Sequence, residues 1–349
     1  MRGLVFAFLA ALLAGVPAHG VTVFDGNVQC IWDNAYSAFP SIIKYGRCYY
    51  VTFREGESHI FDSKGEAAGK IRILRSRGGR KWKSVALLEK EGYDLRDPKL
   101  SVTPDGKLMV TIGGSVYRKR KLVSRQPQVS FSRDGRHFSE PAATVLPSPK
   151  PGSKESSGAW IWRVTWDKAS SCGYTIAYWG KESGYVTLMR TSDGINYERV
   201  TDIEAQGFPN EATLRFLPDG RMLMFLRRDA GDKMACWGVS RPPYTDWDVK
   251  PLDFQVGGPD FIILENGTVV AGGRDYTDGI HRTYLWKGTP DGNFTPWRVL
   301  PSGGDNSYPG FMVVKDEIWV VYYSSHELKW PDGRSRAGIY LARIPIESI

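Results

Sequence analysis

Long apolar stretches, long helix-forming runs and cysteine pairs are scarce in this 349-residue sequence. After residue 20, no segment stays apolar for long enough to cross a bilayer as a helix. The four cysteines form no CxxC pair, which argues against a zinc site. Runs of Ala, Leu, Glu and Lys are also missing, whereas the chain holds 38 Gly, 12 Trp, 17 Tyr and 15 Phe. That composition favours strands joined by tight turns over helices.

Residues 1–20 have the features of a secretory signal peptide. A basic start at Arg2 precedes an apolar run at 4–16, and small residues lead up to Gly20. The run is short for a membrane span, which leaves an uncleaved anchor as the alternative. We expect cleavage after Gly20, no membrane span in the remaining chain, and a secreted or periplasmic protein comprising residues 21–349.

Charge and cysteine content narrow the expected partners. The formal net charge is +8, and the 46 basic and 38 acidic residues are spread along the chain rather than gathered in one stripe. Nucleic-acid binding is therefore not expected, whereas attraction to anionic glycans or substrates is. We expect no metal and no cofactor, because no ligand cluster is recognisable, and we expect a monomer. Export would permit disulfides, in one of three pairings, among Cys30, Cys48, Cys172 and Cys236.

One unit recurs along the chain: a short apolar strand, a tight polar turn and a second strand rich in β-branched or aromatic residues. Asp-Gly and Asn-Gly turns between such strands are strong hairpin signals, because both residues tolerate positive φ. Successive turns are roughly fifty to sixty-five residues apart, the length of a four-stranded propeller blade. The turns are Tyr45-Gly46, Asp105-Gly106, loop 168–173, Asp219-Gly220, Asn266-Gly267 and Asp316-Glu317. The sequence predicts an all-β fold, a six-bladed β-propeller of four-stranded antiparallel blades.

A second signature follows in the later half of several units. Residues 132–138 read SRDGRHF and 191–197 read TSDGINY, with decayed copies at 76–82 and 289–297. In such a turn the Asp accepts backbone N–H bonds, the Gly takes positive φ and the last aromatic packs between blades. These segments resemble the Asp box, or BNR repeat, a structural turn between the third and fourth strands of sialidase-type blades. The strand at 337–345 is expected to pair near the N-terminus and close the ring.

Antiparallel pairing predicts which polar residues share one face of such a propeller. The start of a blade's first strand lies beside the end of its second strand, and the hairpin turn lies at the opposite end. Residues that enter first strands or leave second strands should therefore ring one mouth of the central channel. Those selected as candidate site residues are Arg54, His59, Arg96, Asp97, Glu211, Arg227, Arg274, Tyr308 and Glu327. Such a mouth suits an acidic sugar, although strand-end arginines can also be ordinary solvated surface charges.

The same segments resemble the sialidase (neuraminidase) superfamily over nearly the whole of residues 21–349. Glu211, followed by Arg227, is similar to the family's glutamate-bearing strand and its second arginine. Arg274 is similar to the third arginine, and Tyr308 to the tyrosine of the last blade. The resemblance implies a Tyr308 nucleophile whose proton Glu211 accepts, with the two arginines binding a substrate carboxylate. Glu327 resembles a glutamate that supports an arginine.

The resemblance is weakest in the first blade. Sialidases carry Phe-Arg-Ile-Pro there, whereas this chain has Ala38-Phe39-Pro40 without the arginine. Arg54, at the end of the paired strand, is a hypothetical replacement for the missing member of the anion clamp.

The general acid/base is open among three residues. His59 and Asp62 lie in the loop where the family has its aspartate, and Asp97, next to Arg96 in the second blade, falls where the family places an aspartate beside the substrate. A histidine with a pKa near 6.5 can donate a proton at neutral pH, which keeps His59 in consideration.

The leading hypothesis is an exo-acting, retaining glycoside hydrolase that releases a terminal acidic sugar, with sialic acid as the first expectation. One alternative is a non-catalytic glycan-binding propeller, and another is a sialidase-like hydrolase for a different sugar. A protein-interaction scaffold is a further alternative and would expose apolar patches at the mouth instead of clustered arginines.

Overall fold

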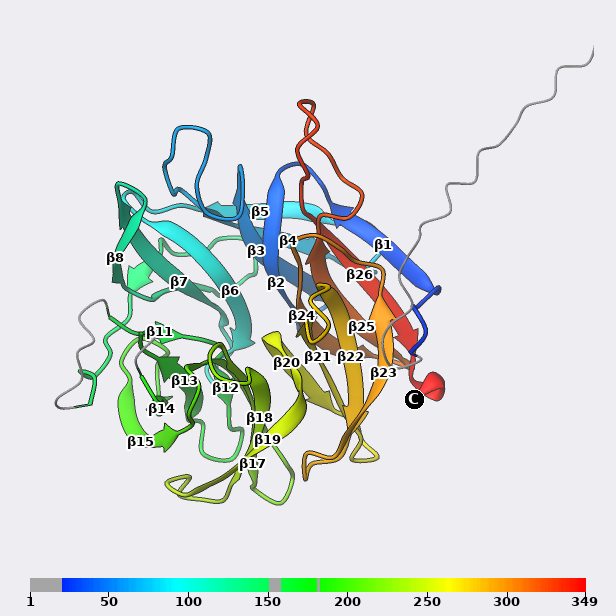
Figure 1. Ribbon diagram of the computed structural model, residues 1–349. Helices are drawn as coiled ribbons and strands as arrows, with labels where there is room; N and C mark the ends of the chain where they lie inside the picture. The colour runs from blue at the N-terminus through cyan, green and yellow to red at the C-terminus, as the bar shows by residue number, and fades with distance from the viewer. Residues whose placement is uncertain (1–20, 151–157, 181–182) are drawn as a thin grey trace, which may run out of the picture.

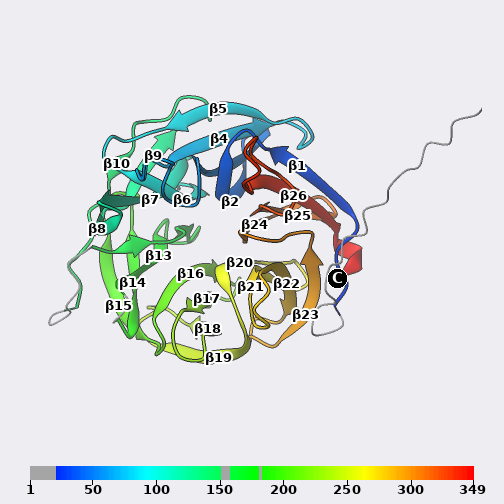
Figure 2. The ribbon, with the colours of Figure 1, turned by 45° about the horizontal axis from the view of Figure 1, so that its top comes forward.

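Six antiparallel sheets are arranged in a ring around a central axis in the computed structural model of the chain (Figure 1; Figure 2). The structure describes residues 21–150, 158–180 and 183–349. The predicted all-β, six-bladed propeller is confirmed, and the only helix described is a 3₁₀ turn, η1 (Ile346–Ser348). The expected signal peptide, at 1–20, lies outside the described residues. No helix in the described ranges is long and apolar enough to cross a membrane.

The first three blades contain the following strands, from the axis outward. Blade 1 holds β2 (Tyr36–Tyr45), β3 (Cys48–Gly56), β4 (Lys70–Ser76) and β5 (Lys83–Leu88). Blade 2 holds β6 (Asp94–Val102), β7 (Leu108–Arg118), β9 (Gln128–Ser132) and β10 (Ala142–Ala143), with β8 (Lys121–Arg125) as a short extra strand on β7. Blade 3 has its inner strand divided into β11 (Trp160–Ile161) and β12 (Thr165–Trp166), followed by β13 (Gly173–Tyr178), β14 (Tyr185–Thr191) and β15 (Glu198–Glu204).

The last three blades are more regular. Blade 4 holds β16 (Pro209–Phe216), β17 (Met222–Arg228), β18 (Met234–Ser240) and β19 (Trp247–Gln255). Blade 5 holds β20 (Gly257–Ile263), β21 (Val269–Asp275), β22 (Arg282–Gly288) and β23 (Phe294–Leu300). Blade 6 holds β24 (Asn306–Val314), β25 (Glu317–Ser324), β26 (Gly338–Pro345) and, outermost, β1 (Asn27–Trp32). Each predicted hairpin turn joins the first two strands of one blade.

The two ends of the chain close the ring together, as the sequence predicts. β1 pairs with β26 in antiparallel register, with Asn27 opposite Arg343, so the N-terminal strand completes blade 6. The preceding residues reach blade 5, where the N–H of Phe24 donates to the carbonyl of Val299 at 2.7 Å. The N-terminal segment therefore forms backbone hydrogen bonds with both blade 6 and blade 5.

Apolar side chains fill the spaces between neighbouring blades. In the described chain they form six buried clusters, one at each blade interface. Strand β17 shows why the inner strands are apolar without interruption: Met222, Met224 and Leu226 pack toward blade 3, whereas Leu223 and Phe225 pack toward blade 5. Alternate residues of a strand point to opposite faces, and here both faces are buried.

The second sequence signature forms the turn geometry expected of it. Asp134 Oδ1 accepts two backbone N–H bonds at 2.8 and 2.9 Å, and Asp193 Oδ1 accepts two at 2.7 and 2.8 Å. Gly135 and Gly194 have positive φ, and Tyr197 is buried between blades 2 and 3. Both turns follow the third strand of their blade. They are structural elements on the face opposite the predicted mouth.

The four cysteines are free thiols, and no disulfide joins them in the structure. Cys48 and Cys236 are buried, whereas Cys30 is exposed. Hydrophobic packing and sheet pairing therefore hold this fold together without covalent cross-links.

Candidate active site

A bulge near the start of the innermost strand recurs around the ring. In blade 1, Ala38 lies opposite Arg54 but Ser41 lies opposite Thr52. Between these two pairs β2 therefore contains one residue more than β3. The same register shift occurs in blades 2, 4, 5 and 6. In four of these blades the displaced residue precedes a proline and has positive φ: Phe39 (62°), Asp97 (47°), Gly258 (62°) and Tyr308 (52°).

These bulges aim side chains at the axis instead of into the blade interfaces. Contacts between blades that are not neighbours show the result. The ring of Tyr308, from blade 6, lies 6.0 Å from that of Trp162, in the gap between β11 and β12 of blade 3. The Tyr308 hydroxyl also reaches Glu211, which is displaced by the bulge of blade 4. The residues at the bulges therefore meet at the mouth of the channel.

Tyr308, Glu211 and Arg227 form the centre of this cluster. The Tyr308 hydroxyl donates to Glu211 Oε1 at 2.8 Å, and an Arg227 Nη1 proton points to the same hydroxyl oxygen at 2.9 Å. Arg227 also pairs with Glu211 Oε2 at 2.9 Å and with Asp229 at 2.8 Å. The backbone N–H of Gly258 donates to Glu211 Oε2 at 2.8 Å. Both oxygens of the Glu211 carboxylate are thus held in fixed directions.

The surroundings of Tyr308 and Glu211 determine the protonation state of each side chain. Burial opposes the charge of Glu211, but Arg227 and the hydrogen bonds from Tyr308 and Gly258 outweigh it and lower the pKa of Glu211. Burial and then the adjacent Glu211 charge raise the pKa of Tyr308 well above 10. At neutral pH the pair is therefore a neutral phenol beside a carboxylate.

Arg274 occupies the neighbouring part of the mouth. Its guanidinium pairs with Asp305 at 2.9 Å, contacts the Tyr323 hydroxyl at 2.6 Å and donates to the carbonyl of Asn306. It also lies over the Tyr308 ring, 5.3 Å from the centroid. Arg274 is thus at the mouth, as the sequence predicts, but its supporting partner Asp305 was not predicted to have a role.

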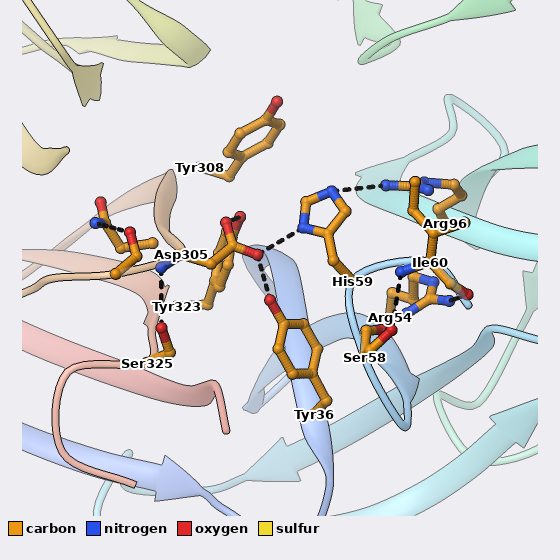
Figure 3. A network of polar contacts seen from close by, with 12 residues as sticks. Tyr36, Arg54, Ser58, His59, Ile60, Arg96, Asp305, Tyr308, Tyr323 and Ser325 are labelled. Atoms are coloured by element: carbon orange, nitrogen blue, oxygen red, sulfur yellow. Dashed lines mark hydrogen bonds and ion pairs between the residues drawn. The ribbon is translucent and has the colours of Figure 1, made fainter. Parts of the chain in front are cut away.

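His59 connects the loop after β3 to the opposite side of the mouth (Figure 3). Its Nδ1 lies 2.5 Å from Asp305 Oδ2, which also accepts a hydrogen bond from the Tyr36 hydroxyl, and its Nε2 lies 3.3 Å from an Arg96 nitrogen. A guanidinium only donates, so His59 Nε2 accepts and Nδ1 carries the proton given to Asp305. Both ring nitrogens of His59 are therefore engaged by the chain.

Asp97 has a carboxyl oxygen that no described residue contacts through a hydrogen bond. Its side chain is 9% exposed, and Oδ2 lies 3.5 Å from Arg96 Nε. Oδ1 is buried and has no hydrogen-bond partner among the described residues. Burial is the largest influence and raises the pKa of Asp97 despite the opposing Arg96 charge. A buried carboxyl that resists ionisation beside a nucleophile is a suitable proton donor.

Lys99 follows Asp97 and Pro98 on β6 and lies farther from the mouth of the channel. It is not among the site residues predicted from the sequence. The residue is 3% exposed, and its ammonium lies 4.4 Å from the centroid of the Trp162 ring. Burial, only partly offset by Asp97, lowers the pKa of Lys99 to about 8. At the same depth, Asp260 pairs with Arg163 at 2.9 Å and with Arg215 at 2.7 Å.

Two predicted site residues lie elsewhere. Arg54 is 1% exposed and binds Asp94 at 2.7 Å and the carbonyls of Ser58 and Ile60, so it supports the loop that carries His59. It does not face the mouth and does not replace the missing arginine. Glu327 lies beyond the end of β25, where its carboxylate accepts from Tyr340 at 2.8 Å. Within the described chain it supports no arginine, and Asp305 takes that role instead.

Asp62 also lies outside the cluster. Its Oδ1 accepts the N–H groups of Lys64 and Glu66 at 2.9 and 2.8 Å, which shapes the loop between β3 and β4. Of the three candidates for the general acid/base, all within the described ranges, Asp97 alone has a buried oxygen without a hydrogen-bond partner, and its charge acts on both Tyr308 and Glu211.

Comparison with known proteins gives structural matches only. The sequence matches no protein-family model and no curated protein. A protein of unknown function from Dyadobacter fermentans is 15% identical with a TM-score of 0.70, over 92% of this chain and 96% of that one. The α-L-arabinofuranosidase arb93a from Fusarium graminearum is 14% identical with a TM-score of 0.64, over 93% and 97%. Trypanosoma rangeli sialidase, solved with the inhibitor DANA, is 12% identical with a TM-score of 0.69, over 88% and 55%.

These similarities define a class of fold. Sialidases and an arabinofuranosidase share the six-bladed architecture of this chain at low identity, so the chain has a glycosidase-like propeller fold. It spans about half the length of the T. rangeli sialidase.

Proposed function

We propose that this protein is an exo-acting, retaining glycoside hydrolase that uses Tyr308 as its nucleophile. The observation that carries the proposal is the position of the Tyr308 hydroxyl, which is held between Glu211 Oε1 at 2.8 Å and Arg227 at 2.9 Å. A phenol with a raised pKa is a weak nucleophile alone, and an adjacent carboxylate is what it needs. Tyrosine nucleophiles are an established exception to the two-carboxylate scheme of glycosidases.

In the first step, Tyr308 Oη attacks the anomeric carbon while the bond to the leaving oxygen breaks. The phenol proton passes to Glu211, and Arg227 stabilises the negative charge that develops on the phenolic oxygen. Because the pKa of Tyr308 is raised and that of Glu211 lowered, proton transfer before attack is unfavourable. The transfer therefore accompanies bond formation.

Asp97 supplies the proton that the leaving oxygen receives. Its raised pKa favours the protonated form, and its unpartnered Oδ1 is free to donate. In the second step, the Asp97 carboxylate accepts a proton from water as the water attacks the tyrosyl-linked sugar. Glu211 then returns its proton to Tyr308, and the product keeps the configuration of the substrate.

The proposed substrate is a terminal acidic sugar, with sialic acid as the first to test. Arg227 and Arg274 flank Tyr308, and a third cation, Arg96, lies beyond Phe39 at 5.2 Å from its ring centroid. A carboxylate next to the anomeric carbon would pair with the two arginines and would repel a carboxylate nucleophile, which a phenol avoids. The proposed exported location would place the enzyme among extracellular glycans.

A second candidate is a hydrolase for a neutral sugar. It is favoured by the burial of Arg54, which leaves two arginines beside Tyr308, each already paired with a carboxylate of the chain. A third hypothesis is that the protein is a propeller that binds glycans without hydrolysing them.

The test is hydrolysis of 4-methylumbelliferyl glycosides by the wild type and by Tyr308→Phe. We expect release from the α-sialoside and a loss of at least about a thousandfold in kcat for the variant, because the attacking oxygen is gone. Tyr322→Phe is the matched control, since this buried tyrosine lies on β25 and donates only to the carbonyl of Pro301. Cleavage of the α-L-arabinofuranoside alone would favour the neutral-sugar candidate. Binding of either sugar without turnover would overturn the enzymatic proposal.

A further inference from the structure

Two adjoining hollows open between blades 1 and 2, with volumes of about 610 and 700 Å³. Arg75 and Arg77 line both of them. We call their combined lining the basic groove. Its cations are Arg47, Arg75, Arg77, Lys81, Lys83, Arg133 and Arg136, joined by His137. The only carboxylate in the same lining is Asp134.

The basic groove lies on the face opposite the active site. Arg47 adjoins the turn between β2 and β3, whereas β3 ends at Gly56, beside the loop that carries His59. Arg77 and Lys81 lie in the turn between β4 and β5, at the same end of blade 1 as Arg47. A ligand in the groove therefore leaves the mouth of the channel free.

The cations of the groove are largely uncompensated. Asp134 accepts the N–H groups of Arg136 and His137 at 2.8 and 2.9 Å and contacts His137 Nδ1 at 2.6 Å, so its charge is used within its own turn. Arg133 pairs with Asp105 at 3.7 Å. In the part of the chain that the structure describes, Arg77 and Lys81 form no ion pair. The lining thus holds seven cations and one carboxylate, whereas over the whole sequence basic and acidic residues are nearly balanced, at 46 to 38.

The groove continues toward blade 6. Arg77 also lines a third hollow of about 1340 Å³, together with Arg80, Lys315 and Arg343. Acidic residues are present there as well, including Glu317 and Glu347, so the one-sided charge is confined to blades 1 and 2. Because Arg77 lines all three hollows, a long ligand bound in the basic groove could extend past Arg77 into the third hollow.

We infer that the basic groove binds an anionic polysaccharide through the sulfate or carboxylate groups along its chain. Guanidinium groups pair with both anions, and a row of such pairs gives affinity that depends on salt. Recognition of the bases of a nucleic acid would require an aromatic platform or an element that enters a duplex groove. The lining offers neither, because Tyr50 is buried and the Tyr45 hydroxyl is held within hydrogen-bond distance of the carbonyls of Gly106 and Arg133. Insertion of the groove into a membrane surface would require exposed apolar side chains beside the cations, and the groove is defined by its charges alone.

The test compares two triple variants with equal loss of charge. Arg77→Ser/Lys81→Ser/Arg136→Ser removes cations from the groove, and Lys121→Ser/Lys168→Ser/Arg241→Ser removes exposed cations elsewhere. Binding of labelled dextran sulfate and of polygalacturonate is measured by fluorescence anisotropy between about 50 and 200 mM salt. Uncharged dextran is the blank, and thermal unfolding verifies that both variants are folded.

We expect the groove variant to bind at least about tenfold more weakly than the wild type at the lower salt, with a smaller salt dependence. The control variant should stay within about twofold, because its cations are dispersed. Preference for dextran sulfate or for polygalacturonate identifies sulfate or carboxylate as the recognised group. Equal losses in the two variants would overturn the proposal, and so would tighter, groove-dependent binding of a DNA duplex. The readout needs no turnover, so it is independent of the proposed glycosidase activity.

Discussion

Gly258 and Tyr308 occupy the same bulge position in neighbouring blades, and the absence of a side chain at one makes room for the ring of the other. A Cβ atom on Gly258 would lie 2.3 Å from Cγ of Tyr308. The N–H of Gly258 also holds the carboxylate that the Tyr308 hydroxyl contacts. One glycine therefore fixes both the nucleophile and its base.

The first prediction concerns this glycine. Gly258→Ala should lower kcat by at least about a hundredfold, because the new methyl group displaces the Tyr308 ring and a misplacement near 1 Å has costs of that order. Gly267→Ala is the control, since Gly267 also has positive φ, but a Cβ atom there would meet no described atom within 4 Å. The control should lose only about 1–2 kcal/mol of stability, with normal kcat. Equal kcat values in the two purified variants would contradict the role given to Gly258.

The architecture could be predicted because its signals are local. Turns such as Asp219-Gly220 and Asn266-Gly267 mark hairpins by their own chemistry, and uninterrupted apolar strands such as β17 indicate burial on both faces. The antiparallel rule then placed Arg227, Arg274 and Glu211 at one mouth, where the structure has them.

The finer geometry of the site could not be predicted, because it depends on contacts between blades. Arg54 is at a strand end like Arg227, but Asp94 of the next blade holds it in the interior. In the sequence, Asp305 is recognisable only as part of the segment that precedes Tyr308. Its ion pair with Arg274 depends on how blade 5 packs against blade 6. The x-Pro dipeptides at the starts of the inner strands, such as Asp97-Pro98, were the available signal for the bulges.

The second prediction concerns the general acid. Asp97→Asn cannot donate a proton, so it should lose at least about a hundredfold in kcat/KM on an alkyl-linked glycoside. A substrate with a 4-methylumbelliferyl leaving group needs little protonation and should lose far less. Because the pKa of Asp97 is raised and the protonated form is active, wild-type kcat/KM should fall as pH rises through that pKa. The variant should lack this basic limb. A loss of equal size on both substrates would assign the acid elsewhere.

The third prediction separates a supporting role of His59 from an acid role. His59→Ala breaks the contacts with Asp305 and Arg96 that fix the loop over the mouth, so KM should rise and kcat should fall by about tenfold through poorer positioning. The pH dependence of kcat/KM should keep the wild-type shape, because Asp97 supplies the proton. His59→Gln, which can still donate to Asp305, should recover part of the activity. Loss of the basic limb in His59→Ala would make His59 the acid instead.

The fourth prediction uses the buried Lys99, whose pKa is lowered to about 8 by burial. An unfolded lysine titrates near 10.5, so between these values the unfolded chain binds more protons and stability rises with pH. Below pH 8 the charged side chain costs about 3 kcal/mol, and this cost disappears near pH 10.5. Lys99→Met keeps the apolar stem and removes the charge, so urea unfolding at pH 7 should show a gain of about 1–3 kcal/mol that falls below about 1 kcal/mol at pH 10. Lys121→Met, at an exposed site, should change neither value. A gain of equal size at both pH values would mean that packing, and not the buried charge, limits stability at this position.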